Sequence, residues 1–286
     1  MNWTLSAFSD EAGPSADQQI NALLRAGLRF IDIRNIDGYN ITELPIEQAK
    51  IVKIKLDDHG ITTQMLGSPV GKIDVSDELL LDIDKLNHLG EMAPIFGCGA
   101  VRMFSYYNKG ERSHDEWQKL TLERLETLRD RAEKMGLVLY HENERHIFGD
   151  LTADVETLAD LRNANFKLIF DFDNYQQSGE DVWATWLRLR ERTDAIHLKD
   201  STPDNKHVPV GQGNGQVEKI LADAVSIGWS GPLTLEPHLT HSQSVVSTGP
   251  SGQQNQAYSQ MEPRESFHIA AETAKELLEK VGANWS

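Results

Sequence analysis

The sequence of 286 residues predicts a single closed α/β barrel, the (β/α)8 class, in which eight parallel strands alternate with helices. Three observations predict it. Short apolar runs recur about every 36 residues, they are apolar on both faces as buried parallel strands are, and glycine separates several of them from a preceding helical stretch. Eight such units in a chain of this length fit a closed barrel better than an open, doubly wound sheet.

The expected strands are the short apolar runs themselves. Their ranges are 3–8, 29–34, 61–66, 100–105, 137–142, 167–171, 194–198 and 232–236. Helical patterns fill the gaps between them; the stretch 114–135, for example, places Leu120, Leu125 and Leu128 on one face. No glycine-rich dinucleotide turn follows the first strand, which also argues against an open nucleotide-binding sheet.

Glycines mark the predicted helix ends. Four of them stand between a helical stretch and an apolar run: Gly27, Gly60, Gly136 and Gly228. Because glycine adopts the left-handed conformation without a Cβ penalty, each is expected to end a helix and lead into a strand. Ser15 and Gln18 have the spacing of a capping box and predict the start of the first helix.

Composition and charge exclude several classes of function. The formal net charge is −16, and no basic patch with interleaved aromatics is present, which argues against a nucleic-acid partner. No apolar stretch approaches the roughly 20 residues of a membrane span, and the N-terminus has no secretion signal. The single cysteine, Cys98, fits a reducing compartment. We expect one domain over residues 1–286, a cytoplasmic location and no membrane partner, with self-association left open.

One segment departs from the repeating pattern. Residues 240–260 are rich in Ser, Gln, Gly and Thr and have almost no apolar periodicity. They follow the eighth strand, on the face where the active sites of such barrels lie. Two interpretations stay open, a surface loop and a mobile lid over the site.

Four consecutive strands end in a side chain that can bind a metal: Glu142, Asp171, His197 and Glu236. Strand ends line the active site of a barrel, and adjacent strands lie about 4.8 Å apart, so these four side chains can converge on one ion. Three carboxylates and one imidazole form an oxygen-rich set. That set predicts one divalent metal, Mn²⁺ first, with Mg²⁺, Co²⁺ or Zn²⁺ as alternatives.

Other polar side chains at strand ends are candidates for substrate contacts. Lys199 has the same parity as His197, so it should face inward, to hold a substrate oxygen or to form a structural ion pair. Arg102 ends the fourth strand, Lys72 follows the third, and Glu144 follows the fifth. We expect each to hold hydroxyl groups or a carbonyl of the substrate.

The loop after the seventh strand is a further candidate. It contains His207 and the run Gly211-Gln212-Gly213. Glycines let the backbone approach a ligand closely, and the loop has no phosphate-binding signature. His207 is therefore included among the expected substrate contacts.

The motifs at these strand ends resemble one family. They are His141-Glu142-Asn143-Glu144, Phe170-Asp171-Phe172-Asp173-Asn174, His197-Leu198-Lys199-Asp200 and Leu235-Glu236-Pro237-His238-Leu239. They resemble the xylose isomerase-like TIM barrels, which include sugar-phosphate isomerases, ketose 3-epimerases, inosose dehydratase-like enzymes and endonuclease IV-type nucleases. The resemblance implies that the four strand-end residues hold a divalent metal. It also implies that Glu142 and Glu236 flank the substrate carbon and exchange its proton.

Two departures from the family pattern bear on the substrate. The epimerases have a histidine substrate contact three residues after the aspartate of the sixth strand, where this chain has Asn174, so Asn174 becomes a substrate-contact candidate. The nucleases need additional metal ligands, and the fourth strand here offers Arg102 and Phe104 instead.

We therefore expect a metal-dependent isomerase or epimerase acting on a keto-sugar or related polyol. A carboxylate would remove a proton next to the carbonyl, through a metal-stabilised enediolate. A keto-sugar dehydratase or lyase is the alternative, because it begins with the same proton abstraction. Two less favoured alternatives are an endonuclease IV-like nuclease and a non-catalytic binding barrel.

Overall fold

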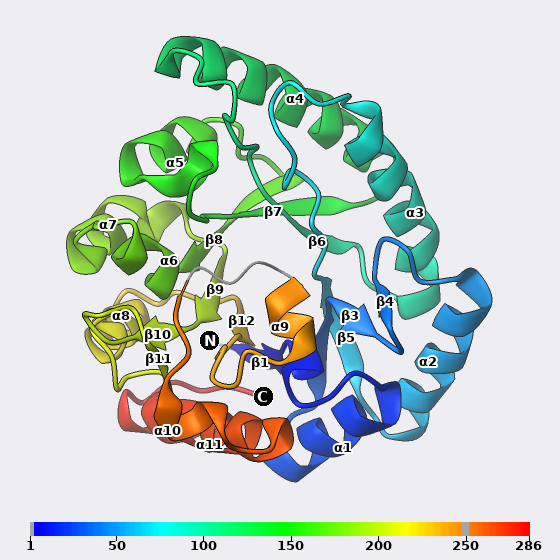
Figure 1. The fold of residues 1–286 in the computed structure, drawn as a ribbon, viewed down its shortest axis with the longest axis vertical. Helices are drawn as coiled ribbons and strands as arrows, with labels where there is room; N and C mark the ends of the chain where they lie inside the picture. Colours follow the sequence, from blue (N-terminus) through cyan, green and yellow to red (C-terminus); the bar gives the residue numbers. More distant parts are fainter. Residues whose placement is uncertain (1–2, 248–251) are drawn as a thin grey trace.

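Residues 3–247 and 252–286 are described by a computed structural model, and the predicted barrel is confirmed. The strands are β1 (Thr4–Ala7), β2 (Phe30–Ile33), β5 (Thr62–Leu66), β6 (Ala100–Met103), β7 (Val138–Glu142), β8 (Phe166–Asp171), β9 (Ala195–Leu198) and β12 (Pro232–Leu235). Their order in the sheet is β1-β12-β9-β8-β7-β6-β5-β2, with every pair parallel. The sheet curls into a nearly closed (β/α)8 barrel, and each expected strand range overlaps one of these strands (Figure 1).

Helices surround the strands as an outer ring (Figure 1). They are α1 (Ala16–Ala26), α2 (Ile46–Asp58), α3 (Leu80–Phe96), α4 (His114–Lys134), α5 (Thr152–Ala159), α6 (Phe172–Gln177), α7 (Val182–Leu189), α8 (Val217–Ser226), α9 (Gln243–Ser247), α10 (Gln256–Ser259) and α11 (Pro263–Lys280). Short 3-10 turns are η1 (Ser9–Glu11), η2 (Phe148–Asp150) and η3 (Arg190–Arg192). Among the described residues, no helix is long and apolar enough to cross a membrane.

The capping residues expected at the helix ends are present. Gly27 follows α1 with φ of 73°, in the left-handed region, and the three other glycines also have positive φ. Ser15 begins α1 with a complete capping box, because its side chain accepts from Gln18 N and the Gln18 side chain accepts from Ser15 N. These caps end each helix at a fixed residue, so the following strand enters the barrel in a fixed register.

The interior below the strand ends is apolar on one side and polar on the other. Met65, Ile169 and Ala195 form a small buried cluster. Because alternate residues of a strand share a face, Ile169 lies below Asp171 and Ala195 lies below His197. Below Glu236 and Arg34, in contrast, the buried side chains are polar, and Thr234 Oγ1 donates a hydrogen bond to Asp32 Oδ2 at 2.7 Å.

Two small antiparallel ribbons and the final helices extend the mouth of the barrel. The ribbons are β3 (Asn35–Ile36) with β4 (Tyr39–Asn40), and β10 (Asp200–Ser201) with β11 (His207–Val208). Helix α9, labelled in Figure 1, lies near β1 in that view. It contacts η1, and its Val245 is buried. Residues 248–251 of the segment expected as a loop or lid lie outside the described residues. The lid, and the single domain over residues 1–286, stay predictions.

Candidate metal and substrate site

The four predicted metal ligands converge at the C-terminal end of the barrel. One ligand atom from each of Glu142, Asp171, His197 and Glu236 lies within 4.8 Å of the others, and all four residues are buried. The sheet register explains the meeting, since Asp171 pairs directly with His197 across β8 and β9, and Thr234 pairs with His197 across β12 and β9. The structure thus brings together side chains that span 95 residues of sequence, from 142 to 236.

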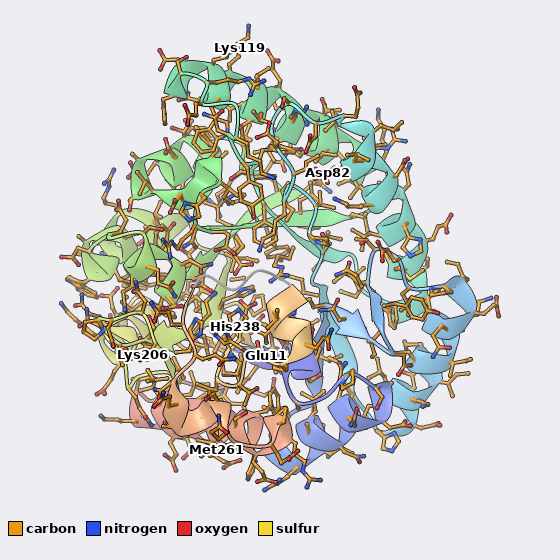
Figure 2. All side chains as sticks on the ribbon, viewed as in Figure 1. Glu11, Asp82, Lys119, Lys206, His238 and Met261 are labelled. Atoms are coloured by element: carbon orange, nitrogen blue, oxygen red, sulfur yellow. The ribbon has the colours of Figure 1, made fainter. Side chains whose placement is uncertain are left out.

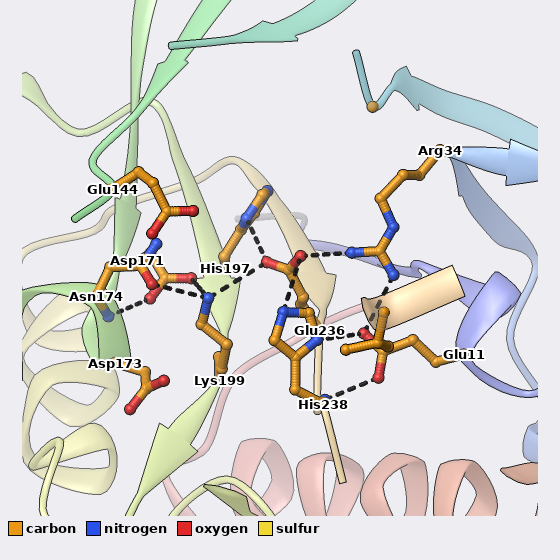
Figure 3. Close-up of polar contacts among 12 residues, drawn as sticks. Glu11, Arg34, Glu144, Asp171, Asp173, Asn174, His197, Lys199, Glu236 and His238 are labelled. Carbon is orange, nitrogen blue, oxygen red and sulfur yellow. Dashed lines mark hydrogen bonds and ion pairs between the residues drawn. The ribbon is translucent and has the colours of Figure 1, made fainter. Parts of the chain in front are cut away.

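Ion pairs connect the members of this quartet. His197 Nδ1 lies 2.8 Å from Glu142 Oε1 and 3.3 Å from Glu236 Oε2. Lys199 Nζ lies 3.2 Å from Asp171 Oδ2 and 3.8 Å from Glu236 Oε2 (Figure 3). Lys199 therefore faces inward, as its parity with His197 predicts. His197 and Lys199 thus lie among three carboxyl groups inside the mouth.

The two glutamates remain ionised in spite of burial. Burial alone would raise the pKa of Glu142, but the charges of His197 and Arg102 lower that pKa to about 2. Burial also opposes ionisation of Glu236, and Lys199, then His238 and His197, hold its pKa well below its usual range. Both carboxylates are thus ionised near neutral pH.

Asp171 and His197 shift in the opposite direction. Burial raises the pKa of Asp171 well above its usual range, more than Lys199 lowers it. Burial disfavours the charged form of His197, but the carboxylates of Glu142 and Glu236 raise its pKa to about 10. The quartet therefore holds protons that a metal ion would have to displace.

The quartet fits a divalent cation. His197 Nε2 is buried and has no hydrogen-bond partner among the described residues, whereas Asp171 Oδ2 and Glu236 Oε2 have only the ion-pair contacts to Lys199 and His197. A buried ring nitrogen without such a partner is costly, and coordination to a cation removes that cost. Three carboxylates and one imidazole provide enough oxygen and nitrogen donors for one ion.

Two arginines orient the glutamates. Arg102 donates from Nη1 to Glu142 Oε2 at 3.1 Å, and Arg34 donates from Nη1 to Glu236 Oε1 at 2.8 Å. Each guanidinium carbon lies 4.6 Å from the centre of the Phe8 ring. The arginines take one oxygen of each carboxylate, so the other oxygen of each turns toward His197.

Arg34 belongs to this site although it is not among the residues predicted from the strand ends. It also binds Asp10 with Nε at 3.0 Å and Nη2 at 2.9 Å, and it lies 3.4 Å from Glu11. Glu11 in turn lies 2.9 Å from His238 Nδ1, and Figure 2 shows both near the middle of the barrel. Arg34 directly follows the apolar run of β2, so the strand-end rule that selected Glu142 would have selected it too.

Burial raises the pKa of Glu11 to about 8, against the attraction of Arg34. Its carboxyl group is therefore largely protonated at neutral pH. This protonated group accepts a hydrogen bond from His238 N at 2.7 Å. Glu11 consequently adds little negative charge beside Glu236.

A cavity of about 500 Å³ adjoins the quartet. Arg34 and Arg102 line it, together with Lys72, Phe104 and Tyr107 among others. Two predicted substrate contacts, Arg102 and Lys72, thus face the cavity. A third, Glu144, accepts a hydrogen bond from Lys72 Nζ at 3.0 Å.

The remaining predicted contacts lie elsewhere. Asn174 lies beside the quartet, where its Oδ1 accepts from Lys199 Nζ at 2.9 Å. His207 is fully buried, with Nδ1 2.9 Å from His241 Nε2 and Nε2 3.3 Å from Asp173, and it is not among the described residues that line the cavity. The structure thus places Asn174 beside the quartet, whereas His207 is buried against His241 and Asp173.

The glycines after the seventh strand bind a carboxylate of the chain itself. Gly211 N and Gly213 N both donate to Asp200 Oδ2 at 2.9 Å, and Gly215 N donates to Asp200 Oδ1 at 3.0 Å. A Cβ on Gly213 would lie 2.3 Å from Asp200 Oδ1, so only glycine fits there. The N–H groups of Gly211 and Gly213 thus bind an internal carboxylate, and the expectation that this run approaches a ligand stays a prediction.

Comparisons with known proteins agree with this architecture. A family model described as xylose isomerase-like TIM barrel matches residues 20–259. An inosose dehydratase from Lacticaseibacillus casei is 30% identical over 94 residues, which are 32% of this chain and only 31% of that relative's length.

Solved structures of low sequence identity share the fold. The IolI protein with a bound zinc atom has a TM-score of 0.76 at 16% identity, covering 98% of this chain and 99% of that one. An L-ribulose 3-epimerase has a TM-score of 0.73 at 15% identity, covering 98% of this chain and 95% of that one. At these identities the likeness establishes the fold alone.

Proposed function

The chain belongs to the xylose isomerase-like TIM barrel family, and on that basis we propose that it is a divalent-metal-dependent isomerase or epimerase. Its substrate would be a keto-sugar or related polyol that loses and regains a proton next to the carbonyl. The observation that carries this proposal is the pair Glu142 and Glu236. Both are ionised, and their carboxylates converge with the other two quartet residues at the mouth of the barrel. The epimerase title of one structural neighbour is consistent with that chemistry.

Each residue of the quartet has a proposed task. Asp171 and His197 would hold the ion, and Glu142 and Glu236 would both contact it and handle the proton. A divalent ion bound there, Mn²⁺ in our proposal, would polarise the substrate carbonyl as a Lewis acid and so acidify the adjacent C–H. The zinc in one structural neighbour supports a divalent ion of some kind.

The two glutamates are oriented for proton transfer before substrate arrives. Arg102 and Arg34 each fix one carboxylate oxygen, so the second oxygen is the one presented to a substrate carbon. One glutamate removes the proton. If the other returns it from the opposite face, the carbon is inverted; if the same glutamate returns it to the neighbouring carbon, the sugar is isomerised.

A keto-sugar dehydratase is the second candidate, favoured by two observations. The curated relative that matches 32% of the chain is named an inosose dehydratase. In addition, the Lys199 ammonium lies 3.8 Å from Glu236 Oε2. An ammonium beside the base can donate a hydrogen bond to a hydroxyl group as it leaves, and dehydration must expel that group.

Proton exchange in D₂O tests both candidates. The Mn²⁺-loaded protein is incubated with a panel of keto-sugars, and products are followed by mass spectrometry. Deuterium uptake without loss of mass supports the isomerase, whereas loss of water supports the dehydratase. No exchange and no loss with any keto-sugar would overturn the proposal.

A pair of isosteric variants shows which carboxylate acts. Glu236→Gln should slow exchange by about 10²- to 10⁴-fold, the range of general-base catalysis. Metal content is measured beside the rate, so that loss of the base is distinguished from loss of the ion. Glu265→Gln, on exposed α11, is the matched control and should exchange as fast as the parent protein.

A further inference from the structure

The cavity beside the quartet occupies the opposite half of the barrel mouth. The quartet comes from β7, β8, β9 and the end of β12, whereas the cavity lies over β2, β5 and β6 and the segments that follow them. Arg34 and Arg102 belong to both, since each lines the cavity and holds a glutamate. A molecule whose reacting carbon lies at Glu142 and Glu236 must therefore extend into the cavity.

The charge of the cavity lining contrasts with that of the whole chain. Four of the twelve lining residues are cationic and one is acidic. The cationic ones are Arg34, Lys72, Lys85 and Arg102, and the acidic one is Glu43. The chain as a whole has 28 basic and 44 acidic residues, so the cations are concentrated at this surface.

The two lysines belong to the part of the lining that does not contact the quartet. Lys72 Nζ donates to Glu144 at 3.0 Å and lies 4.3 Å from the centre of the Phe104 ring. Lys85 Nζ donates to Asp82 at 2.9 Å. Each lysine thus contacts an acidic side chain, and the two lysine side chains are 17% and 26% exposed. Both line the cavity, where a ligand can reach them.

A neutral sugar would gain little from Lys72 and Lys85. Asn35, Asn40 and Thr42, which also line the cavity, provide amide and hydroxyl groups of the kind that bind sugar hydroxyls. Cationic groups are favoured where a ligand carries negative charge, because charge-assisted hydrogen bonds are the stronger ones.

We propose that the cavity binds an anionic group at the end of the substrate remote from its carbonyl, so that the substrate is a keto-sugar acid or a keto-sugar phosphate. Lys72 and Lys85 bind the anion, and the amide and hydroxyl groups bind the carbon chain. The orientation of the substrate rests on the proposed function, which places the reacting carbon at the quartet. The anion site itself does not depend on the reaction catalysed.

Binding of three ligands that differ only at C6 tests this site. D-Fructose, D-fructuronate and D-fructose 6-phosphate carry a hydroxymethyl, a carboxylate and a phosphate there. Titration calorimetry on the full chain in Mn²⁺ buffer should show one of the anions binding about 10- to 100-fold tighter than D-fructose. The tighter of the two anions identifies the source of the charge, and its advantage should fall with added NaCl.

Lysine variants connect the preference to the cavity. Lys85→Gln and Lys72→Gln should each reduce the preference for the anion by about tenfold or more. Lys50→Gln, an exposed lysine of α2 paired with Glu47, is the matched control and should keep it. Thermal melting of each variant confirms that it is folded.

Two results would overturn the anion site: equal affinity for all three ligands, or a preference that survives in both cavity variants. Failure of the proposed function looks different. Selective anion binding without deuterium exchange would keep the site and refute the isomerase, whereas exchange of neutral keto-sugars without anion preference would do the reverse.

Discussion

Replacing Arg34 with glutamine should destabilise the protein far more than the same replacement at Arg25. Both arginines bind a carboxylate through two nitrogens, Arg34 to Asp10 at 3.0 and 2.9 Å and Arg25 to Glu265 at 2.6 and 2.9 Å. They differ in burial. The side chains of Arg34 and Asp10 are each 1% exposed, whereas those of Arg25 and Glu265 are 46% and 44% exposed.

The expected loss in unfolding free energy follows from the buried carboxylates that the substitution leaves without their counter-ion. Without Arg34, the buried carboxylates of Asp10 and Glu236 lose their shared counter-ion, and Glu11 loses the cation 3.4 Å away. Breaking a buried ion pair from one side costs about 3–5 kcal/mol, because the remaining charge stays desolvated. The exposed Arg25 pair is solvated in both variants, so its loss should barely change the unfolding free energy.

Urea unfolding of the metal-free proteins, followed by circular dichroism, measures the difference. The loss in Arg34→Gln should shrink as the pH falls from 8 to 5, because protonation of the unpaired carboxylates removes the buried charge. Equal losses in Arg34→Gln and Arg25→Gln, or a loss that grows toward pH 5, would refute the reasoning.

Three further predictions concern other parts of the molecule. A cation must displace the proton from His197, whose pKa is about 10, so the Mn²⁺ affinity should rise between pH 6 and 8, by up to about tenfold per pH unit. Competition with a fluorescent chelator measures this affinity. An affinity that does not change with pH would contradict the prediction. Asp200→Ala should destabilise the folded chain by about 1–3 kcal/mol for each glycine N–H left without an acceptor. The midpoint of urea unfolding measures this loss. An unchanged midpoint would show that the Asp200 carboxylate does not stabilise the loop. Burial raises the pKa of the Cys98 thiol to about 11, so a disulfide reagent at pH 8 should label it slowly in the folded protein and rapidly in urea; equal rates would mean that the thiol is accessible.

The elements of the fold could be predicted because their signals are local. A strand shows as an apolar run, and a helix end shows as a glycine such as Gly27 that takes a positive φ. The quartet could be predicted for a related reason. Strand alternation fixes which way Asp171 and His197 point, and the barrel register places the two side by side.

The substrate contacts were predicted less completely, because side-chain pairing is not a local property. Lys199 and Asn174 lie at the quartet as expected, but His207 is turned into the protein toward Asp173 and His241. The run Gly211-Gln212-Gly213 also gives no indication that its backbone N–H groups bind the carboxylate of Asp200, a residue of the same chain.

The sequence by itself determined the barrel, the strand ends and the four side chains placed there, since each depends on spacing within one βα unit. Only the tertiary structure decided how those side chains are held. Arg34 and Glu236 are 202 residues apart and meet because the barrel brings the ends of β2 and β12 to one mouth. The cationic cavity likewise forms from the ends of separate strands. Contacts of this kind depend on closure of the sheet and on the burial that closure creates, and no single stretch of sequence contains either.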